Sequence, residues 1–276
     1  HSYIPYPYVS EDDVLWVKRV RKKIDIRIPQ NHSLYFPVQR SYGDYDGWMG
    51  YSAKTGTDKN FNEVLSGTDA RKNLFQILRD AATTIDPRTG RPLVSTYNMT
   101  MTRELTTQEA VPDWANGSPG AFGYISTEEA DDEDAEEIIL LNWFKAADIV
   151  YYLIEEEIFF DKRRAKLDFR YVSITPVVRD PEASSETSQL PTFYFPEIRH
   201  LLANHAIFPL NGNMAQRTSF DEFFHRKAFA SNIIKETNVY DRTISDYLPA
   251  RQLDQLLEGK RIKEQIRRYE SDMWNY

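Results

Sequence analysis

The chain has 276 residues, 41% of them hydrophobic, and a formal net charge of −8. The hydrophobic content supports a packed interior, and the negative charge argues against duplex DNA or RNA as the main partner, because phosphate binding needs a surplus of Lys and Arg. The chain contains no cysteine, which excludes disulfides, thiolate nucleophiles and cysteine-based zinc sites and is compatible with an oxidising compartment.

The longest strictly apolar runs are residues 138–141 and 149–154. Both are far shorter than the roughly 20 residues that span a bilayer, so we predict no transmembrane segment. The chain opens at His1 and shows no signal-peptide hydrophobic region, which suggests a processed mature form or a trimmed piece of a longer chain.

The first predicted element is a helix over residues 10–27. Ser10 and Asp13 stand at the positions of a capping box, and acids precede basic residues as the helix dipole prefers. The basic run 18–23 would crowd one side of this helix. That side is expected either to meet an acidic partner or lipid headgroups, or to be an ordinary solvated face.

Residues 40–69 are rich in Gly, Tyr and Asp and have no steady period, so they predict a long loop or a small hairpin. A second helix is predicted over residues 69–84 with Asp69 as its cap, followed by a strand over 93–101. The acidic stretch 128–137 is predicted to be a solvated loop. It lacks the glycine that a calcium-binding EF-hand requires.

The strongest strand signals come next. Residues 166–180 and 190–196 are rich in β-branched and aromatic residues and flank a polar loop. Residues 149–164 are ambiguous between strand and helix. We favour a strand there, because the apolar residues are of the β type.

Three helices are predicted after these strands, over residues 196–208, 219–236 and 250–274. Ser219 and Glu222 can form a capping box at the start of the second of them. In the last helix, Gly259 is expected to lower stability by about 1 kcal/mol relative to alanine.

The elements together predict an α+β fold, in which an antiparallel β-sheet or hairpin at about 149–195 packs with N-terminal and C-terminal helices. The sequence contains no internal repeat and no clear linker. Residues 1–276 are therefore predicted to form a single domain, with irregular insertions at about 40–69 and 113–137.

No motif in the sequence selects a catalytic or metal site. His200 and His205 would lie about 140° apart around a helix, and neither HExxH nor a nucleophile elbow, a P-loop or a dinucleotide-binding turn occurs. We predict that the protein is not an enzyme and uses no cofactor or metal. The alternative is a periplasmic hydrolase with an unrecognised carboxylate pair, since such pairs come from distant positions.

Residues suited to protein contact are plentiful. Seventeen Tyr and five Trp exceed what a core needs, and interfaces favour Tyr, Trp and Arg. The stretch KETNVYDRTISDY at 235–247 is expected either to fix a connection through an internal ion pair or to bind a neighbouring chain. Residues 161–164, between two β-type segments, are predicted to form an exposed charged tip suited to docking.

Four sequence blocks occur together and in order. They are PYPYVSEDDVLWVKRVRKKIDIRIPQNHSLYFP near the N-terminus, FFDKRRAKLDFRYVSITPV in the middle, and KETNVYDRTISDY and LLEGKRIKEQIRRYESDMW at the end. This arrangement resembles the gliding-motility family GldN of Bacteroidetes bacteria, called PorN in non-gliding relatives. The likeness covers nearly the whole chain, although residues 40–69 and 113–137 look longer here than expected of the family.

The resemblance implies a structural, non-enzymatic component of the type IX secretion system that is exported to the periplasm. Members of the family assemble with the lipoprotein GldK (PorK) into a large ring at the inner face of the outer membrane. They also contact the periplasmic part of the motor protein GldM (PorM). The resemblance implies no cofactor and no nucleic-acid partner. A related alternative is an adaptor that binds the lipoprotein without forming a ring.

The suspected partner interface combines three regions, namely the predicted first helix, the charged tip and the connection before the last helix. Its residues are Trp16, Lys18, Arg19, Lys22, Asp161, Lys162, Arg163, Arg164, Tyr240, Asp241 and Arg242. Among them, Lys18, Arg19 and Lys22 are expected to face an acidic partner or the membrane side.

Overall fold

The structure is a computed structural model, and it describes residues 3–36, 72–111, 113, 116–128, 138–179, 187–207, 218–238, 242–249 and 251–273. The predictions for residues 40–69 and for residues 129–137 therefore lie outside the described residues. So do the predicted interface residues Tyr240 and Asp241.

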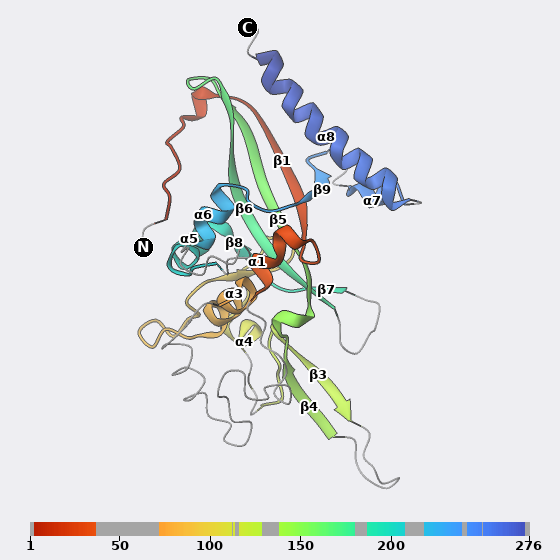
Figure 1. The fold of residues 1–276 in the computed structure, drawn as a ribbon. Coiled ribbons are helices and arrows are strands. Elements are labelled where there is room, and N and C mark those ends of the chain that lie inside the picture. The colour runs from red at the N-terminus through yellow and green to blue at the C-terminus, as the bar shows by residue number, and fades with distance from the viewer. Residues whose placement is uncertain are drawn as a thin grey trace.

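In the described part of the chain, a seven-stranded antiparallel sheet carries the strand order β2-β8-β6-β5-β1-β9, with β7 also paired to β6. Its three long central strands form the spine of the molecule in Figure 1. The strands are β1 (Val14–Asp25), β2 (Thr96–Tyr97), β5 (Ile149–Asp161), β6 (Lys166–Arg179), β7 (Thr187–Gln189), β8 (Thr192–Tyr194) and β9 (Asn232–Glu236).

The helix predicted over residues 10–27 is wrong, because Val14–Asp25 form β1. The acids that suggested a helix start form only the short 3₁₀ turn η1 (Glu11–Asp13). From Val14 onward, β-branched residues recur and the exposure alternates with a period of two, which is the pattern of a strand. The strand is then fixed by pairing with β5, a segment more than a hundred residues away in the sequence.

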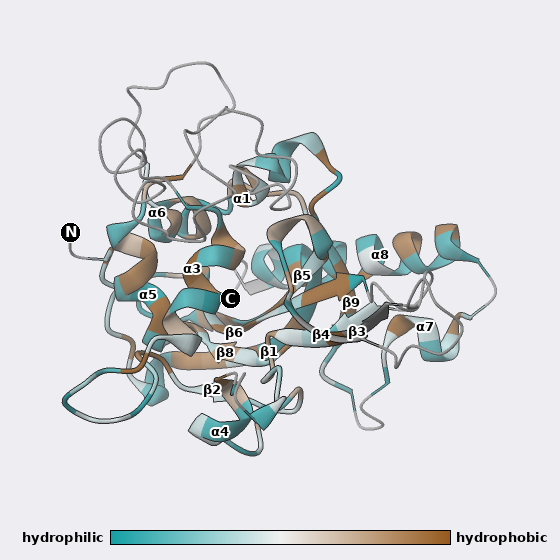
Figure 2. Cartoon of the chain, turned by 90° about the horizontal axis from the view of Figure 1, so that it is seen from below, coloured by the Kyte–Doolittle hydropathy of each residue, from teal (hydrophilic) through white to brown (hydrophobic). Residues whose placement is uncertain are grey.

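Helices cover one face of the sheet, and a smaller layer lies on the other. Figure 2 shows α1, α3, α5 and α6 on one side of the strands and α4 on the other, next to the edge strand β2. The helices and turns on these faces are η2 (Pro29–Asn31), α1 (His32–Tyr35), α3 (Leu74–Thr83), α4 (Thr107–Ala110), η4 (Ala146–Asp148), α5 (Phe195–Asn204) and α6 (Phe220–His225). The predicted α+β class, with an antiparallel sheet packed against helices, is confirmed.

The main core lies between the sheet and these helices and is rich in aromatic side chains. Tyr171 of β6 packs against Phe195 of α5 and Phe224 of α6, with ring centroids 4.8 and 6.0 Å away. The Tyr171 hydroxyl donates a hydrogen bond of 2.9 Å to the carbonyl of Phe224, so its one polar group is satisfied. Burial raises the pKa of Tyr171 well above its ordinary value.

A second, smaller core lies under the C-terminal helix α8 (Gln252–Met273), which follows the short α7 (Ile244–Tyr247). Val20 of β1, Ile158 of β5 and Ile233 of β9 pack there against Ile262 and Ile266 of α8. The helix thus covers the end of the sheet that the other helices leave open (Figure 1).

A two-stranded hairpin stands apart from the main sheet. It consists of β3 (Gly123–Glu128) and β4 (Ile138–Trp143), and among the described residues these strands pair only with each other. In Figure 1 the hairpin projects from the body, away from the tip that joins β5 to β6.

Several predicted boundaries are confirmed and others are corrected. The strands predicted over 149–164 and 166–180 and the helices predicted over 196–208 and 250–274 occur as β5, β6, α5 and α8, but β5 already ends at Asp161 and α5 at Asn204. The helix predicted over 69–84 with Asp69 as its cap begins later, because α3 is capped by Asn73, which forms a capping box with Gln76. Of the strand predicted over 93–101, only the two residues of β2 have strand structure.

The helix predicted over residues 219–236 is only partly right. Ser219 caps its start by accepting a hydrogen bond of 3.2 Å from the Glu222 N–H, but α6 ends at His225. Lys227 then takes the left-handed backbone conformation, with φ of 50°, which stops the helix. The β-branched residues that follow form β9.

Candidate partner interface

The basic residues of β1 face a row of acids on β5. Arg19 lies opposite Glu157, with Nη2 2.5 Å from Oε1, and Arg21 lies opposite Glu155 and forms an ion pair with it. Both pairs are partly exposed, so each contributes at most about 1 kcal/mol. They leave a mixed, nearly balanced surface on this side of the sheet. A wholly basic face, as the predicted helix would have had, does not form here.

The side chains on the other face of β1 are more deeply buried. Lys22 forms an ion pair with Glu156, whose side chain is fully buried. Lys227 Nζ lies 3.2 Å from the second oxygen of Glu156 and 3.6 Å from the centroid of the Phe169 ring. Burial lowers the pKa of Lys227 to about 8, although Glu156 acts in the opposite direction. Lys22 therefore stabilises the folded chain, because it neutralises the buried carboxylate of Glu156.

Lys18 and Trp16 lie on the same side, next to the C-terminal helix. Lys18 forms an ion pair with Glu236 of β9, and both side chains are largely buried. The Trp16 ring stacks on Tyr269 of α8, with centroids 5.0 Å apart. All four predicted residues on β1 therefore contact other parts of the same chain, and Arg19 is the most exposed of them.

The charged tip is present where it was predicted, as the turn between β5 and β6. Asp161 is buried and accepts hydrogen bonds from the N–H groups of Arg163 and Arg164, at 2.9 and 3.2 Å. Arg164 Nε lies 2.6 Å from the same carboxylate. Burial acts to raise the pKa of Asp161, but these hydrogen bonds and the Arg164 charge outweigh it and hold the pKa below its ordinary range.

These contacts divide the tip into two groups. Asp161 and Arg164 hold the turn together, and Arg164 also lies 3.4 Å from Asp168. Lys162 and Arg163 project outward, with 74% of the Arg163 side chain exposed. Its guanidinium nitrogen Nη1 lies 3.9 Å from Oδ2 of Asp13.

Arg242 lies in the connection between β9 and α7. Its N–H donates to Asn238 Oδ1 at 2.9 Å, and its carbonyl accepts from Asn238 Nδ2 at 2.8 Å. Thr243 then caps α7, forming a capping box with Asp246. The amide of Asn238 thus ties both ends of this connection by hydrogen bonds.

The structure brings two of the three predicted regions together. Val14 at the start of β1 pairs with Asp161 at the tip, so both regions lie at one end of the sheet, beside the later turns of α8 (Figure 1). Arg242 lines a hollow together with Glu258 and Arg261 of α8.

Sequence analysis missed the contacts that hold the N-terminal segment. Arg199 and Asp221 form a buried ion pair with Nε and Oδ1 2.8 Å apart. Ile4 N–H donates to Asp221 Oδ2 at 2.8 Å, and Arg199 Nη2 donates to the Ile4 carbonyl. The Arg199 guanidinium also lies 4.1 Å from the centroid of the Tyr6 ring. Alternating Tyr and Pro at residues 5–8 was the only signal of an extended, docked segment.

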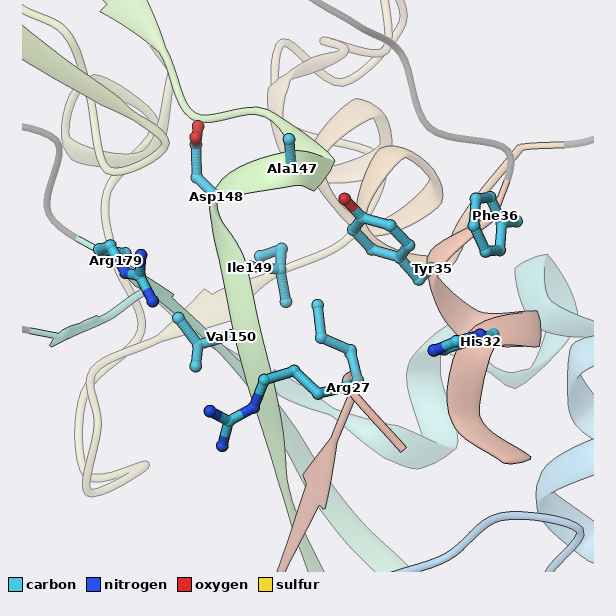
Figure 3. A pocket seen from close by; sticks show the side chains of 10 residues that line it. Arg27, His32, Tyr35, Phe36, Ala147, Asp148, Ile149, Val150 and Arg179 are labelled. Carbon is cyan, nitrogen blue, oxygen red and sulfur yellow. The ribbon is translucent and has the colours of Figure 1, made fainter. Parts of the chain in front are cut away.

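A hollow lies at the opposite end of β1, next to α1 and η4. Its lining includes Tyr35, Asp148, Arg27 and Arg179, which Figure 3 shows around Ile149. Burial raises the pKa of Asp148 even though its carboxylate accepts a hydrogen bond from Lys145 N–H. Asp148 is the one carboxylate among the described lining residues of this hollow, whereas the hydrolase alternative needs two.

Two searches of the described residues bear on other functions. They contain no cluster of three or more His, Asp or Glu that could hold a metal ion. No helix among them is both long and apolar enough to cross a membrane.

The fold and these surfaces together define a class of protein. It is an α+β protein in which the predicted interface residues of the described part of the chain lie on a long strand and in two charged turns. The family model described as "Gliding motility associated protein GldN" matches residues 9–275, so the chain belongs to the GldN family. A comparison with curated proteins found no match.

Membership of this family associates the chain with gliding motility and type IX secretion. GldN is a family of structural components of that machinery and is not a known enzyme family. The suspected resemblance to GldN, based on four sequence blocks in order, is therefore confirmed.

Proposed function

We propose that the protein is a periplasmic ring subunit of the type IX secretion and gliding machinery. In this proposal it assembles with the lipoprotein GldK (PorK) at the inner face of the outer membrane and contacts the periplasmic part of GldM (PorM). It acts as a scaffold without catalysis. The observation that carries the proposal is the family match over residues 9–275, which covers nearly the whole chain and so leaves little room for another functional unit within it.

The geometry supports a contact role for one end of the sheet. Lys162 and Arg163 project from the tip, and Arg19 lies partly exposed on β1 nearby. Exposed basic side chains on a chain of net charge −8 offer a local surface for an acidic partner. We propose these three residues as the partner-binding part of the predicted interface. Asp161, Arg164 and Lys22 would support them from within.

The direct test is a mass determination by light scattering after gel filtration, first on the protein alone and then mixed with the lipoprotein. A stable complex or ring on mixing supports the proposal. A protein that elutes unchanged in the presence of the lipoprotein contradicts it. The same mixture with the motor protein's periplasmic domain tests the second contact independently.

A further inference from the structure

The first described residues form an extended arm that side chains of the body hold in place. This N-terminal arm, residues 3–8, runs from the tip end of the sheet to α5 and α6 (Figure 1). It lies beside β6, since Arg170 Nη2 donates a hydrogen bond of 2.8 Å to the Pro7 carbonyl. Pro5 and Pro7 lack the N–H that a strand residue donates, so the arm forms no regular ladder with this strand.

The groove that holds the arm, formed by Arg170, Arg199 and Asp221, binds both backbone groups of one residue. The Asp221 carboxylate accepts a hydrogen bond of 2.8 Å from Ile4 N–H, and Arg199 Nη2 donates to the Ile4 carbonyl. The guanidinium groups of Arg170 and Arg199 lie 4.3 and 4.1 Å from the centroid of the Tyr6 ring. The groove therefore fits an extended segment that carries a tyrosine two residues after the residue bound through its backbone.

An empty groove would be unfavourable. Arg199 and Asp221 are only 5% and 2% exposed, and without Ile4 each would lose a hydrogen-bond partner. Buried charged groups that lose such partners destabilise the fold. Residues 4–7 of this chain have the fit that the groove requires, as the structure shows, and every further copy of the chain carries the same segment.

The turn that joins the arm to β1 is suited to opening. Its three residues, Glu11, Asp12 and Asp13, are all acidic, and Ser10 before them makes no side-chain capping hydrogen bond. Like charges at such short separations repel one another. Arg163 Nη1, at 3.9 Å from Asp13 Oδ2, offsets part of this repulsion. An acidic partner that binds Arg163 would therefore also loosen the turn.

The arm starts from the end of the sheet that we propose as a contact surface. Lys162 N–H donates to the Asp13 carbonyl at 2.8 Å, so the turn before β1 sits on the tip. The chain from Asp13 to Ile4 spans at most about 30 Å when extended. A groove of a neighbouring copy within this distance would meet the arm at a local concentration of about millimolar. Because the contacts in both grooves are the same, the neighbour's arm can replace the chain's own.

We propose that, in the assembled ring, the arm of one copy occupies the groove of the next copy. The exchange keeps the contacts that Ile4 and Tyr6 make in the structure and joins two copies. Because arm and groove are different surfaces, the contact is heterologous and propagates from copy to copy. Before assembly the arm occupies its own groove. This inference rests on the proposed function, since it names the segment and the groove through which ring subunits hold one another.

Photo-cross-linking of the full chain tests the exchange. Tyr3, whose ring centroid lies 4.7 Å from the Arg199 guanidinium, is replaced by the photoreactive analogue p-benzoylphenylalanine. The protein is irradiated alone and with the lipoprotein, and mass spectrometry identifies the peptides joined to residue 3. A link within one chain leaves a monomer on a denaturing gel, whereas a link between copies gives a covalent dimer. The same replacement at Tyr8, whose side chain is 88% exposed, is the control.

We expect residue 3 to link to α5 or α6 in both conditions and residue 8 to give a background yield. Adding the lipoprotein should raise the yield of dimer linked from residue 3 to α5 or α6 at least tenfold. A dimer linked in this way without the lipoprotein also supports the exchange. A product that stays monomeric with the lipoprotein overturns it, as does a link from residue 3 to the lipoprotein or the lack of any link to α5 and α6.

The contact itself is tested by Ile4→Pro in the chain that carries the photoreactive residue 3. This substitution removes the N–H that Asp221 accepts and lies outside the sheet and its helices. The yields of the monomeric and dimeric links to α5 or α6 should both fall at least tenfold. A dimer yield unchanged by Ile4→Pro would mean that another contact produces the dimer, and it overturns the proposal.

Light scattering on the same mixtures separates this inference from the proposed function. A complex with the lipoprotein in which the residue 3 product is monomeric leaves the ring proposal standing and overturns the exchange. Dimers linked from residue 3 to α5 or α6, in a protein that forms no complex with the lipoprotein, support the exchange and contradict the proposed function.

Discussion

Gly259 of α8 lies against the backbone carbonyl of Ile233 in β9, so closely that a Cβ at residue 259 would stand 2.7 Å from the carbonyl oxygen. Helix propensity alone predicts that alanine here would stabilise the protein by about 1 kcal/mol. The structure predicts the reverse, because the methyl group would meet backbone that has little freedom to move. We expect Gly259→Ala to lower the free energy of unfolding by about 1–3 kcal/mol, measured by denaturant titration.

Arg267→Ala provides a matched control for this prediction. Residue 267 lies on the same helix and is exposed, so the substitution should change the free energy of unfolding by no more than about 0.5 kcal/mol. A Gly259→Ala variant more stable than the parent protein would show that α8 does not pack against β9 in this way.

The long strands and the last helix could be predicted from the sequence, because their patterns are local. Residues 149–161 and 166–179 are rich in β-branched and aromatic residues, and they form the strands β5 and β6. For β1 the local signal was misleading. Acids before basic residues suggested a helix, whereas the strand forms because the distant segments β5 and β9 pair with it.

The candidate interface could be predicted only in part from the sequence, because contacts with distant residues decide which of its side chains are exposed. A charged turn between two β-type segments predicts an exposed tip, and the tip exists. Which arginine of the tip is exposed depends on a buried carboxylate. Asp161 forms an ion pair with Arg164, and the Arg163 side chain stays exposed. Lys22 could not be assigned to the interior, because its partner Glu156 lies far away in the sequence.

The ion pair between Arg199 and Asp221 predicts a large effect on stability. Both side chains are almost fully buried, so Arg199→Met would leave the Asp221 carboxylate in the interior without its cation. We expect this substitution to lower the free energy of unfolding by about 3–5 kcal/mol. The amide of Ile4, bonded to Asp221, should also exchange its hydrogen faster with solvent.

The double variant Arg199→Met with Asp221→Leu tests the reason given for this effect. It removes both charges, so it should be more stable than Arg199→Met alone. If the single variant were as stable as the parent protein, the anchoring of the N-terminal segment by this pair would be refuted.

Lys227 predicts a pH dependence of stability above neutrality. Burial lowers its pKa to about 8 in the folded protein, whereas an unfolded lysine titrates near about 10.4. Between these values the unfolded chain binds more protons, so this group makes the free energy of unfolding rise with pH, and below about pH 8 its contribution is constant. The difference in unfolding free energy between the parent protein and Lys227→Met should therefore increase from about pH 8 to pH 10.

Arg226→Met is the control for this titration, because the neighbouring guanidinium stays charged throughout this range. Its difference from the parent protein should be the same at pH 8 and pH 10. A difference for Lys227→Met that is also independent of pH would mean that Lys227 is not desolvated beside Glu156 in solution.

Charge reversal at the two adjacent arginines of the tip should affect the free energy of unfolding very differently. Arg164→Glu should lower the free energy of unfolding by about 3 kcal/mol or more, because it removes the cation from the buried Asp161 and adds a like charge beside it. Arg163→Glu should change stability by no more than about 0.5 kcal/mol, since its side chain is exposed.

Under the proposed function, Arg163→Glu should still weaken binding to an acidic partner. The loss should shrink as salt is raised from about 50 to 500 mM, because exposed charges are screened over about a Debye length. Titration calorimetry or light scattering with the lipoprotein, and separately with the motor protein's periplasmic domain, measures the effect and identifies the partner. Binding of both partners that is unchanged by Arg163→Glu at low salt would remove the tip from the interface.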